Sequence, residues 1–488
     1  MGRSELPAEI QTCHHSLPAN HHQSIISILD GISATHRARA EFGFAQLGDQ
    51  RRTKRLVKVA QSLAANPGGT LPQAFPQWDE LKAAYRLFGQ RGVGFEAILR
   101  PHWQRTQEAC RQAGEYLIIE DTTLLDYTDH HPATQDLGVI GDATGRGFEL
   151  HSALAVRVEG WTLEQRPEGV VVGLLGQRCS TPRRKPKGSK PAPRYTEPRK
   201  TQCWAAALEA AGSPAVGAQW IYVADCESDF YEPMEICQRR EIDFIIRAYH
   251  NRRLAQGEGH LFERLAQAPV LGQMTVEVRA RPGQSARTAM VAGRAVRVDL
   301  DGPWRPGGRR ESLANIYAVE VYEVHTPEAV KEPLHWILLT SLPCTTWAQL
   351  QRIIGRYTAR WWVEEYHKAL KSGAGVQDSQ LERAYRLESL IAVLSVVAVR
   401  LLSTKFLART RPENFEAAQS FGPQMLALLE AKLGKPKGGW TNANVLIATA
   451  RLGGFLARKH DGMPGWQTIW RGWHRLMWMV EGVEALNL

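Results

Sequence analysis

The chain has 488 residues and 43% of them are hydrophobic, so it is long enough for more than one domain and apolar enough to bury a core. Its 60 Lys and Arg residues outnumber its 50 Asp and Glu residues, and the net charge of +10 favours an acidic partner such as nucleic acid. The seven cysteines form no CxxC pair, which argues against a disulfide framework and favours a reducing cytoplasm.

The N-terminus, residues 1–38, is expected to be a poorly ordered extension. It has polar, His-rich residues where a secretory signal would have an apolar run. His14, His15, His21 and His22 have no Cys or Asp partner nearby, so they are interpreted as a polar tail rather than a metal site.

Residues 39–105 are predicted to form a helical DNA-binding domain. The segment QLGDQRRTKRLVKVAQSLA starts with Asp49 as a candidate helix cap, and DELKAAYRLF follows as a second helix. The basic residues on these helices fit either a solvated charged face or a surface that contacts DNA. The candidates for DNA contact are Arg51, Arg52, Arg55, Lys58 and Arg86.

Residues 106–405 are predicted to form a mixed α/β core. EYLIIEDTTLLDY contains a buried strand over 116–119 with Asp121 just past its end, and QWIYVADCESDFYE contains a strand over 221–224 with Asp225 at its end. The Pro-rich basic stretch 181–200 is expected to be an exposed loop, which either touches DNA or is only a solvated linker. The alternating pattern within 255–345 predicts an inserted antiparallel β subdomain, and helices follow it to the C-terminus.

The helical segment YTARWWVEEYHKALK carries an unusual stripe of charges and aromatic rings. At about 100° per residue, Tyr357, Arg360 and Lys371 all lie within about 40° of Glu364, whereas Glu365 points about 100° away. Glu364 is therefore the likelier metal ligand of the two glutamates. An ordinary Arg–Glu pair within the helix would explain Arg360 but neither Tyr357 nor Lys371.

Asp121, Asp225 and Glu364 together have the chemistry of a magnesium site. Mg²⁺ prefers hard oxygen ligands, and two such ions about 3.5–4 Å apart can activate a water and stabilise a leaving oxygen at a phosphodiester. An isolated Asp after a strand is more often a cap or turn residue. The prediction therefore depends on the three carboxylates meeting in space.

The spacing Y-x2-R-x3-E-x6-K resembles the signature of the insertion-sequence-four family of bacterial DDE transposases. LGDQRRTKRL, KAAYRLF, IEDTTLLDY, ADCESD, PLHWILLTSLP, HKALKSGAGV, VAVRLL and ARLGGF resemble the same family in the same order. The resemblance implies an RNase H-like catalytic core with a β insertion, flanked by an N-terminal helical DNA-binding domain and a C-terminal helical dimerisation domain at 406–488. It also implies that Asp121, Asp225 and Glu364 are catalytic and bind two Mg²⁺ ions, for which Mn²⁺ can substitute.

The resemblance further implies DNA contacts near the site. Trp336 matches a tryptophan that stacks on a flipped base, with Trp361 as a second candidate, and Arg247 matches a DNA-contacting arginine beside Tyr357, Arg360 and Lys371. Trp362 stands where the family has an arginine. Near the C-terminus a stripe of side chains is expected at the dimer interface, although such stripes more often lie in a core: Trp466, Trp470, Trp473 and Met477.

The function implied is cut-and-paste transposition by a homodimer that binds double-stranded DNA, both the inverted repeats at transposon ends and the target. The protein is expected in the bacterial cytoplasm, associated with the nucleoid and with no membrane. Two alternatives remain, a non-catalytic domesticated or inhibitory DNA-binding derivative and an RNase H-like nuclease without strand transfer. Of these, the intact carboxylates and basic N-terminal helices argue against the first.

Overall fold

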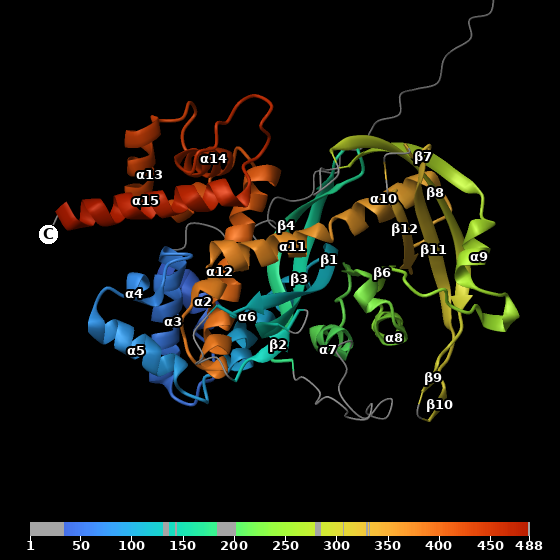
Figure 1. The fold of residues 1–488 in the computed structure, drawn as a ribbon, viewed down its shortest axis with the longest axis horizontal. Coiled ribbons are helices and arrows are strands. Elements are labelled where there is room, and N and C mark those ends of the chain that lie inside the picture. Colours follow the sequence, from blue (N-terminus) through green and yellow to red (C-terminus); the bar gives the residue numbers. More distant parts are fainter. Residues whose placement is uncertain are drawn as a thin grey trace, which may run out of the picture.

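In the computed structural model, N-terminal helices and C-terminal helices lie on one side of a large central sheet (Figure 1). The structure describes residues 34–129, 136–141, 144–182, 202–278, 285–305, 307–327, 330 and 332–486. The four N-terminal histidines, Cys13 and nearly all of the basic loop 181–200 lie outside these residues. None of the six cysteines within them forms a disulfide.

The N-terminal region is helical, as predicted. Its helices are α2 (Ala34–Phe42), α3 (Gln50–Ala65), α4 (Leu71–Ala74), α5 (Trp78–Phe88) and α6 (Phe95–Ala109). Asp49 caps α3, because its side chain accepts a hydrogen bond from the backbone N–H of Arg51. Because α2 begins at Ala34, the expectation of a poorly ordered extension is wrong for 34–38.

The central sheet has ten strands in the described part of the chain. Its path runs β2-β3-β1-β5-β6-β12-β11-β8-β7, with β4 paired to β3. The pairs β1–β5 and β5–β6 are parallel and the other pairs are antiparallel. The strands are β1 (Gly114–Asp126), β2 (Gly138–Ile140), β3 (Gly145–Trp161), β4 (Pro167–Ser180), β5 (Ala218–Ala224), β6 (Asp243–Arg247), β7 (Val270–Val278), β8 (Arg287–Leu300), β11 (Leu313–Val324) and β12 (His335–Thr340).

The expected β insertion is not a separate sheet. Its strands are present, but β12 pairs antiparallel with β6, so β11, β8 and β7 extend the core sheet. The edge of β6 would otherwise leave a row of backbone N–H and C=O groups unpaired, and β12 satisfies them. The first part of 255–345 is not strand either, because a 3₁₀ turn η3 (Ala255–Gly257) and α9 (Leu261–Ala266) precede β7. A small ribbon, β9 (Trp304–Arg305) with β10 (Gly308–Arg309), stands apart from the sheet.

Helices follow the strands that carry the predicted site. They are α7 (Gln202–Ala211), the 3₁₀ turn η2 (Cys226–Ser228), α8 (Tyr231–Arg239), α10 (Trp347–Thr358), α11 (Trp361–Lys368), the π turn η4 (Ala369–Gly373) and the 3₁₀ turn η5 (Val376–Asp378). The segment expected as one helix from Tyr357 to Lys371 is thus interrupted twice. Around Ala359 and Arg360 the backbone bonds tighten to residues three apart, as in a 3₁₀ turn, and α11 starts anew from there.

The long helix α12 (Ala384–Thr410) connects the parts of the protein. It packs against α6 and α3 on the N-terminal side, against β4 and against α14. In the described chain it is the one helix long and apolar enough to cross a bilayer, but 78% of its apolar window is buried inside the protein. It is therefore a core helix. The chain ends with α13 (Glu416–Leu433), α14 (Asn442–Leu452) and α15 (Trp466–Leu486).

The loop after β6 is fixed by a buried carboxylate, which gives a test of the fold. Asp229 accepts hydrogen bonds from the backbone N–H groups of Tyr249 and His250 at 2.7 and 2.8 Å, and its carboxylate pairs with Arg252. Because Asp229→Ala removes the buried carboxylate that pairs with Arg252 and accepts from two backbone N–H groups, we expect it to cost about 3 kcal/mol of unfolding free energy. The urea midpoint of purified protein measures the loss.

A matched control is Glu108→Ala, which breaks an exposed ion pair with Arg111. Solvent already screens that pair, so its removal should leave the urea midpoint close to the wild-type value. Equal midpoints for the two variants would contradict the role assigned to Asp229.

Candidate active site

Asp121 and Asp225 occupy equivalent places on two neighbouring parallel strands. β1 and β5 are in register with Ile119 opposite Val223, so the residues two positions further along, Asp121 and Asp225, lie next to each other. Neighbouring strands are about 4.8 Å apart. The strands form because 116–119 and 220–224 are buried apolar and aromatic runs, and the carboxylates come where those runs end.

Arg247 extends the same row onto the next strand. β5 and β6 are also parallel, with Ala224 opposite Ile246, which puts Arg247 beside Asp225. The resemblance singled out Arg247, and the register of the sheet brings it to the two aspartates. A positive charge in this place can hold a phosphate against the carboxylates.

Glu364 reaches the site from α11, which packs against β1. The guanidinium of Arg360 links them, with one nitrogen 2.6 Å from a carboxylate oxygen of Glu364 and the other 3.5 Å from Asp121. Two segments separated by more than 200 residues are therefore joined through one cation. Figure 1 shows α11 crossing beside the strands of this part of the sheet.

The charge of Asp121 is influenced by both of the other carboxylates. Burial raises the pKa of Asp121 to about 6; Arg360 opposes that rise, while the charges of Asp225 and Glu364 add to it. Like charges so close destabilise each other unless a cation compensates them. Arg360 supplies one positive charge to three carboxylates, and the site retains an excess of negative charge.

The donor set fits a hard divalent cation, because it offers carboxylate oxygens and no sulfur. No three His, Cys, Asp or Glu side chains in the described ranges already form a metal cage as they stand. The Arg360 guanidinium accounts for this, since it contacts the oxygens of both Asp121 and Glu364. A metal bound here would have to share or take over those oxygens.

Aromatic side chains lie next to the carboxylates. Burial raises the pKa of Tyr357, and the charges of Arg360, Arg247 and Asp225 act on its phenol. Trp336, from β12, lies with its ring centre 6.0 Å from that of Tyr357 and remains half-buried. Both residues proposed from the sequence are thus at the site.

Lys371 does not share the environment of Glu364, contrary to the stripe expected from helical spacing. It lies in the π turn η4, where burial lowers its pKa and the nearest opposing charge is Asp126 at the end of β1. The π turn closes with a bond between residues five apart, from Ala374 N–H to Ala369 C=O. The wider turn changes the phase of every residue after Lys368, so the spacing argument fails there.

The other tryptophans of this segment differ in exposure. Trp361 is 43% exposed, with the Lys368 ammonium 4.3 Å from its ring centre, so its face is already covered by a cation. Trp362 packs edge-on against Phe406 in the core. The substitution of tryptophan for arginine at 362 therefore supplies packing rather than a surface contact.

Sequence reasoning missed a buried polar network beneath Asp121. One nitrogen of the His151 ring lies 3.1 Å from Glu120 and the other 3.0 Å from Thr122, the two residues that flank Asp121. Tyr222 donates to the same Glu120 carboxylate. Burial raises the pKa of Glu120. The adjacent acids in the IEDTT segment were a possible signal, but nothing in it indicated a histidine partner from β3.

The basic N-terminal residues lie on the outer faces of α3 and α5, while Leu56, Val59 and Leu63 face inward. Some already have partners. Arg51 pairs with Asp49, Arg52 donates to the Leu47 carbonyl and Lys58 pairs with Glu80 on α5. Arg55 is half-buried and Arg86 is exposed. The predicted residues therefore form a basic surface, but the geometry does not distinguish which of them would contact DNA.

The C-terminal stripe is not an exposed interface. Trp466, Trp470 and Met477 are buried within the chain, and Trp473 packs edge-on against Phe421 of α13. The expectation that these residues face a second subunit is therefore wrong for Trp466, Trp470 and Met477 in the described chain, where α13, α14 and the π turn η4 pack against α15. The exposed aromatic residue of this helix is Trp478.

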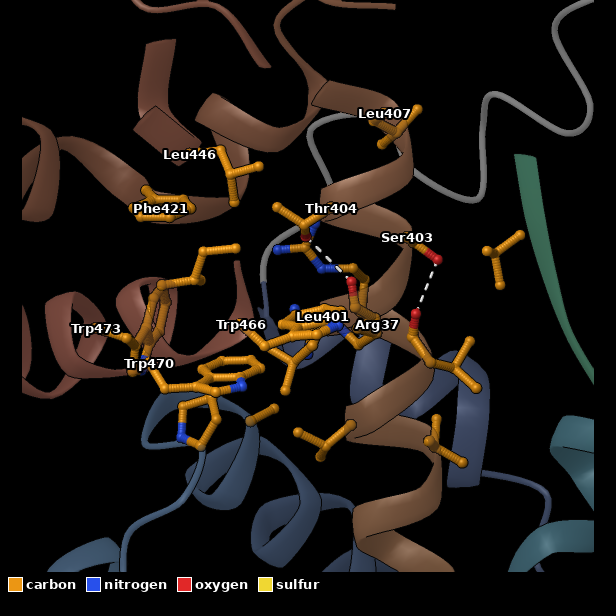
Figure 2. Close-up of a pocket in the computed structure, with 18 of the residues that line it drawn as sticks. Arg37, Leu401, Ser403, Thr404, Leu407, Phe421, Leu446, Trp466, Trp470 and Trp473 are labelled. Atoms are coloured by element: carbon orange, nitrogen blue, oxygen red, sulfur yellow. Dashed lines mark hydrogen bonds between the residues drawn. The ribbon is translucent and has the colours of Figure 1, made fainter. Parts of the chain in front are cut away.

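A cavity of about 130 Å³ lies away from the carboxylates. It is enclosed by α2, α12 and α15, and Trp466, Trp470 and Trp473 line it (Figure 2). None of Asp121, Asp225 and Glu364 contributes to its walls. The cavity thus belongs to the junction between the N-terminal and C-terminal helices.

Two family models match the chain at its two ends. Residues 34–93 match the transposase DNA-binding domain, which covers α2 to α5 and the basic surface. Residues 396–486 match the transposase Tn5 dimerisation domain, which covers the second half of α12 and the helices α13 to α15. The strands and the helix that carry the three carboxylates lie between the two matches. The two ends of the chain are therefore similar to the DNA-binding and Tn5 dimerisation domains of transposases.

Proposed function

We propose that the protein is a cut-and-paste DNA transposase of the DDE class, in which Asp121, Asp225 and Glu364 are the catalytic residues. The observation that carries the proposal is the convergence of these carboxylates from β1, the end of β5 and α11. The matched DNA-binding and dimerisation domains supply the other functions that a transposase needs.

Asp121, Asp225 and Glu364 would together hold two Mg²⁺ ions, with Mn²⁺ as a substitute. When bound, these ions would activate the attacking water and stabilise the leaving oxygen of the phosphodiester. Once cations neutralise the carboxylates, the Arg360 guanidinium is free to pair with a DNA phosphate. Its planar shape suits two-pronged contact with phosphate oxygens.

The proposed reaction is a series of in-line phosphoryl transfers at one site. Water attacks at the transposon end and frees a 3′-OH, which attacks the opposite strand to give a hairpin; the hairpin is opened, and the 3′-OH then attacks target DNA. Positioning and charge neutralisation supply most of the rate in such reactions. Arg247, Tyr357 and Lys371 would position phosphates, and Trp336 would stack on an unpaired base.

End recognition is assigned to the basic surface of α3 and α5, and a homodimer would bridge two transposon ends in the bacterial cytoplasm. The direct test is incubation of the protein with Mg²⁺ and linear DNA that carries the inverted repeats flanking its gene. Nicks, hairpins and joined products are expected in that order. Nicks without joining would identify a nuclease instead, and binding without nicks a non-catalytic derivative.

The first mutational prediction concerns the carboxylates. Asp225→Ala or Glu364→Ala should abolish cleavage and leave end binding intact, because each removes a metal ligand without touching α3 or α5. Gel electrophoresis and fluorescence anisotropy measure the two activities. Glu227→Ala, which removes an exposed acid two residues from Asp225, is the control and should cleave normally. Full cleavage by either ligand variant would overturn the site.

The second prediction concerns Trp336. Since stacking on an unpaired base contributes about 1–3 kcal/mol, Trp336→Ala should slow hairpin formation roughly tenfold to a hundredfold while the first nick is less affected. Time courses on end DNA resolve the two products. Equal loss at both steps would show that Trp336 supports Tyr357 rather than a flipped base.

The third prediction concerns pH. Burial raises the pKa of Asp121 from its ordinary range to about 6, so its metal-binding charged form is lost as pH falls through that value. Cleavage should therefore decline below about pH 6, and higher Mg²⁺ should move the midpoint to lower pH because the cation competes with the proton. Arg360→Gln, which removes the charge that lowers this pKa, should move the Mg²⁺-free midpoint of Asp121, followed by NMR, to higher pH.

A further inference from the structure

Glu365 follows Glu364 in the chain, but its carboxylate faces the C-terminal domain. One of its oxygens accepts two hydrogen bonds. One comes from the indole N–H of Trp466 on α15, at 2.6 Å, and the other from the ammonium group of Lys405 on α12. The other oxygen accepts from the indole N–H of Trp361 at 3.3 Å and lies 3.6 Å from the Lys368 ammonium. This carboxylate therefore ties α11 to two other helices.

The tie is shielded from solvent. The side chains of Glu365 and Lys405 are 17% and 12% exposed, and the Lys405 ammonium also sits 4.4 Å from the centre of the Trp466 ring. Burial alone would raise the pKa of Glu365, but the hydrogen bonds from Lys405 and Trp466, together with the charges of Lys405 and Lys368, outweigh it and hold that pKa below its ordinary value. Breaking a buried pair on one side is costly, unlike the loss of a surface ion pair.

Both partners belong to the dimerisation domain. Lys405 and Trp466 lie within the matched residues 396–486, whereas α11 lies outside them. A second contact links α15 to the end of the same segment, because Gly373 in the π turn lies against the Trp470 ring so closely that a Cβ there would be 2.1 Å from a ring atom. The dimerisation domain thus touches α11 at Glu365 and the turn that follows it.

The helix α11 depends on such contacts for its orientation. It has eight residues, begins after the tight turn at Ala359 and Arg360, and ends in the π turn η4. Irregular backbone at both ends means that neither α10 nor α12 fixes its rotation as a continuous helix would. A small rotation would move Glu364 away from Asp121, and a displacement of about 1 Å at a catalytic group can cost about a hundredfold in rate.

We propose that Glu365 is a positioning residue through which the dimerisation domain holds α11, and with it Glu364, in place beside Asp121. The inference rests on the proposed function, in which Glu364 is catalytic. The Glu365 carboxylate would then couple the packing of the C-terminal helices to the position of Glu364 in the active site.

The test compares substitutions that remove single hydrogen bonds. Glu365→Gln removes the charge, and Trp466→Phe removes the indole N–H and keeps an aromatic ring. Trp473→Phe is the matched control, because Trp473 lies on the same helix, lines the same cavity (Figure 2) and has an indole N–H without a hydrogen-bond partner in the described chain. Lys405→Met is a third tie-breaking variant that keeps the aliphatic stem.

Three measurements are made on the full-length protein: end-DNA binding, the single-turnover nicking rate at saturating DNA with Mg²⁺, and amide hydrogen exchange of 361–373 without DNA or metal. We expect Glu365→Gln and Trp466→Phe to slow nicking by about tenfold to a hundredfold and to speed exchange of α11, with end binding unchanged. Trp473→Phe should resemble the wild type. The double variant that combines Glu365→Gln with Trp466→Phe should nick no more slowly than the slower of the two single variants, because both substitutions remove the same hydrogen bond.

Wild-type exchange of α11 in Glu365→Gln would overturn the proposal, as would equal effects of Trp466→Phe and Trp473→Phe. Should Glu365→Gln fail to fold, Lys405→Met and Trp466→Phe give the same comparison. A wild-type protein that does not cut end DNA would refute the proposed function instead, while the exchange measurement would still decide whether the tie exists.

Discussion

The parallel pairing of β1 with β5 and of β5 with β6 is the constraint on which the site depends. The register puts Asp121, Asp225 and Arg247 at equivalent places on three adjacent strands, so two negative charges and one positive charge form a row at the edge of the buried core. The two pairings bring together residues that are 104 and 22 positions apart in the chain. A shift of one residue in either pairing would turn a carboxylate to the opposite face of the sheet.

The three strands do not supply the third carboxylate, which comes from α11, a helix that lies much later in the sequence and packs against β1. One helix face presents Glu364 and Arg360 to β1, and the other presents Glu365 to α12 and α15. The two adjacent glutamates thus differ in their surroundings. Glu364 adds negative charge to the acidic site, whereas the charge of Glu365 is balanced by Lys405. In the absence of divalent cations, the Arg360 guanidinium reduces the repulsion between the carboxylates of Asp121 and Glu364.

The sequence was informative where a local pattern determines the outcome. The apolar run before Asp225 gave the end of β5 at Ala224, and helical spacing separated Glu364 from Glu365. The strand end expected before Asp121 is wrong, because β1 continues to Asp126 and Asp121 pairs within it with Ser152 of β3. It failed where the outcome depends on distant partners. No local pattern could tell that β12 would pair with β6, that a π turn would move Lys371 towards Asp126, or that other helices would cover Trp466, Trp470 and Met477. Periodicity shows that a face is apolar but not what covers it.

The helix α12 has one more consequence. The matched dimerisation domain begins at residue 396, in the middle of this helix, whose earlier turns pack against the N-terminal helices and β4. The protein is therefore not a string of modules that can be separated by proteolysis or by cloning at family boundaries. A chain that ends before residue 396 would keep only the first part of the apolar helix α12 and would lose the C-terminal helices that pack against it. Such a chain is expected to aggregate rather than to behave as an isolated catalytic unit.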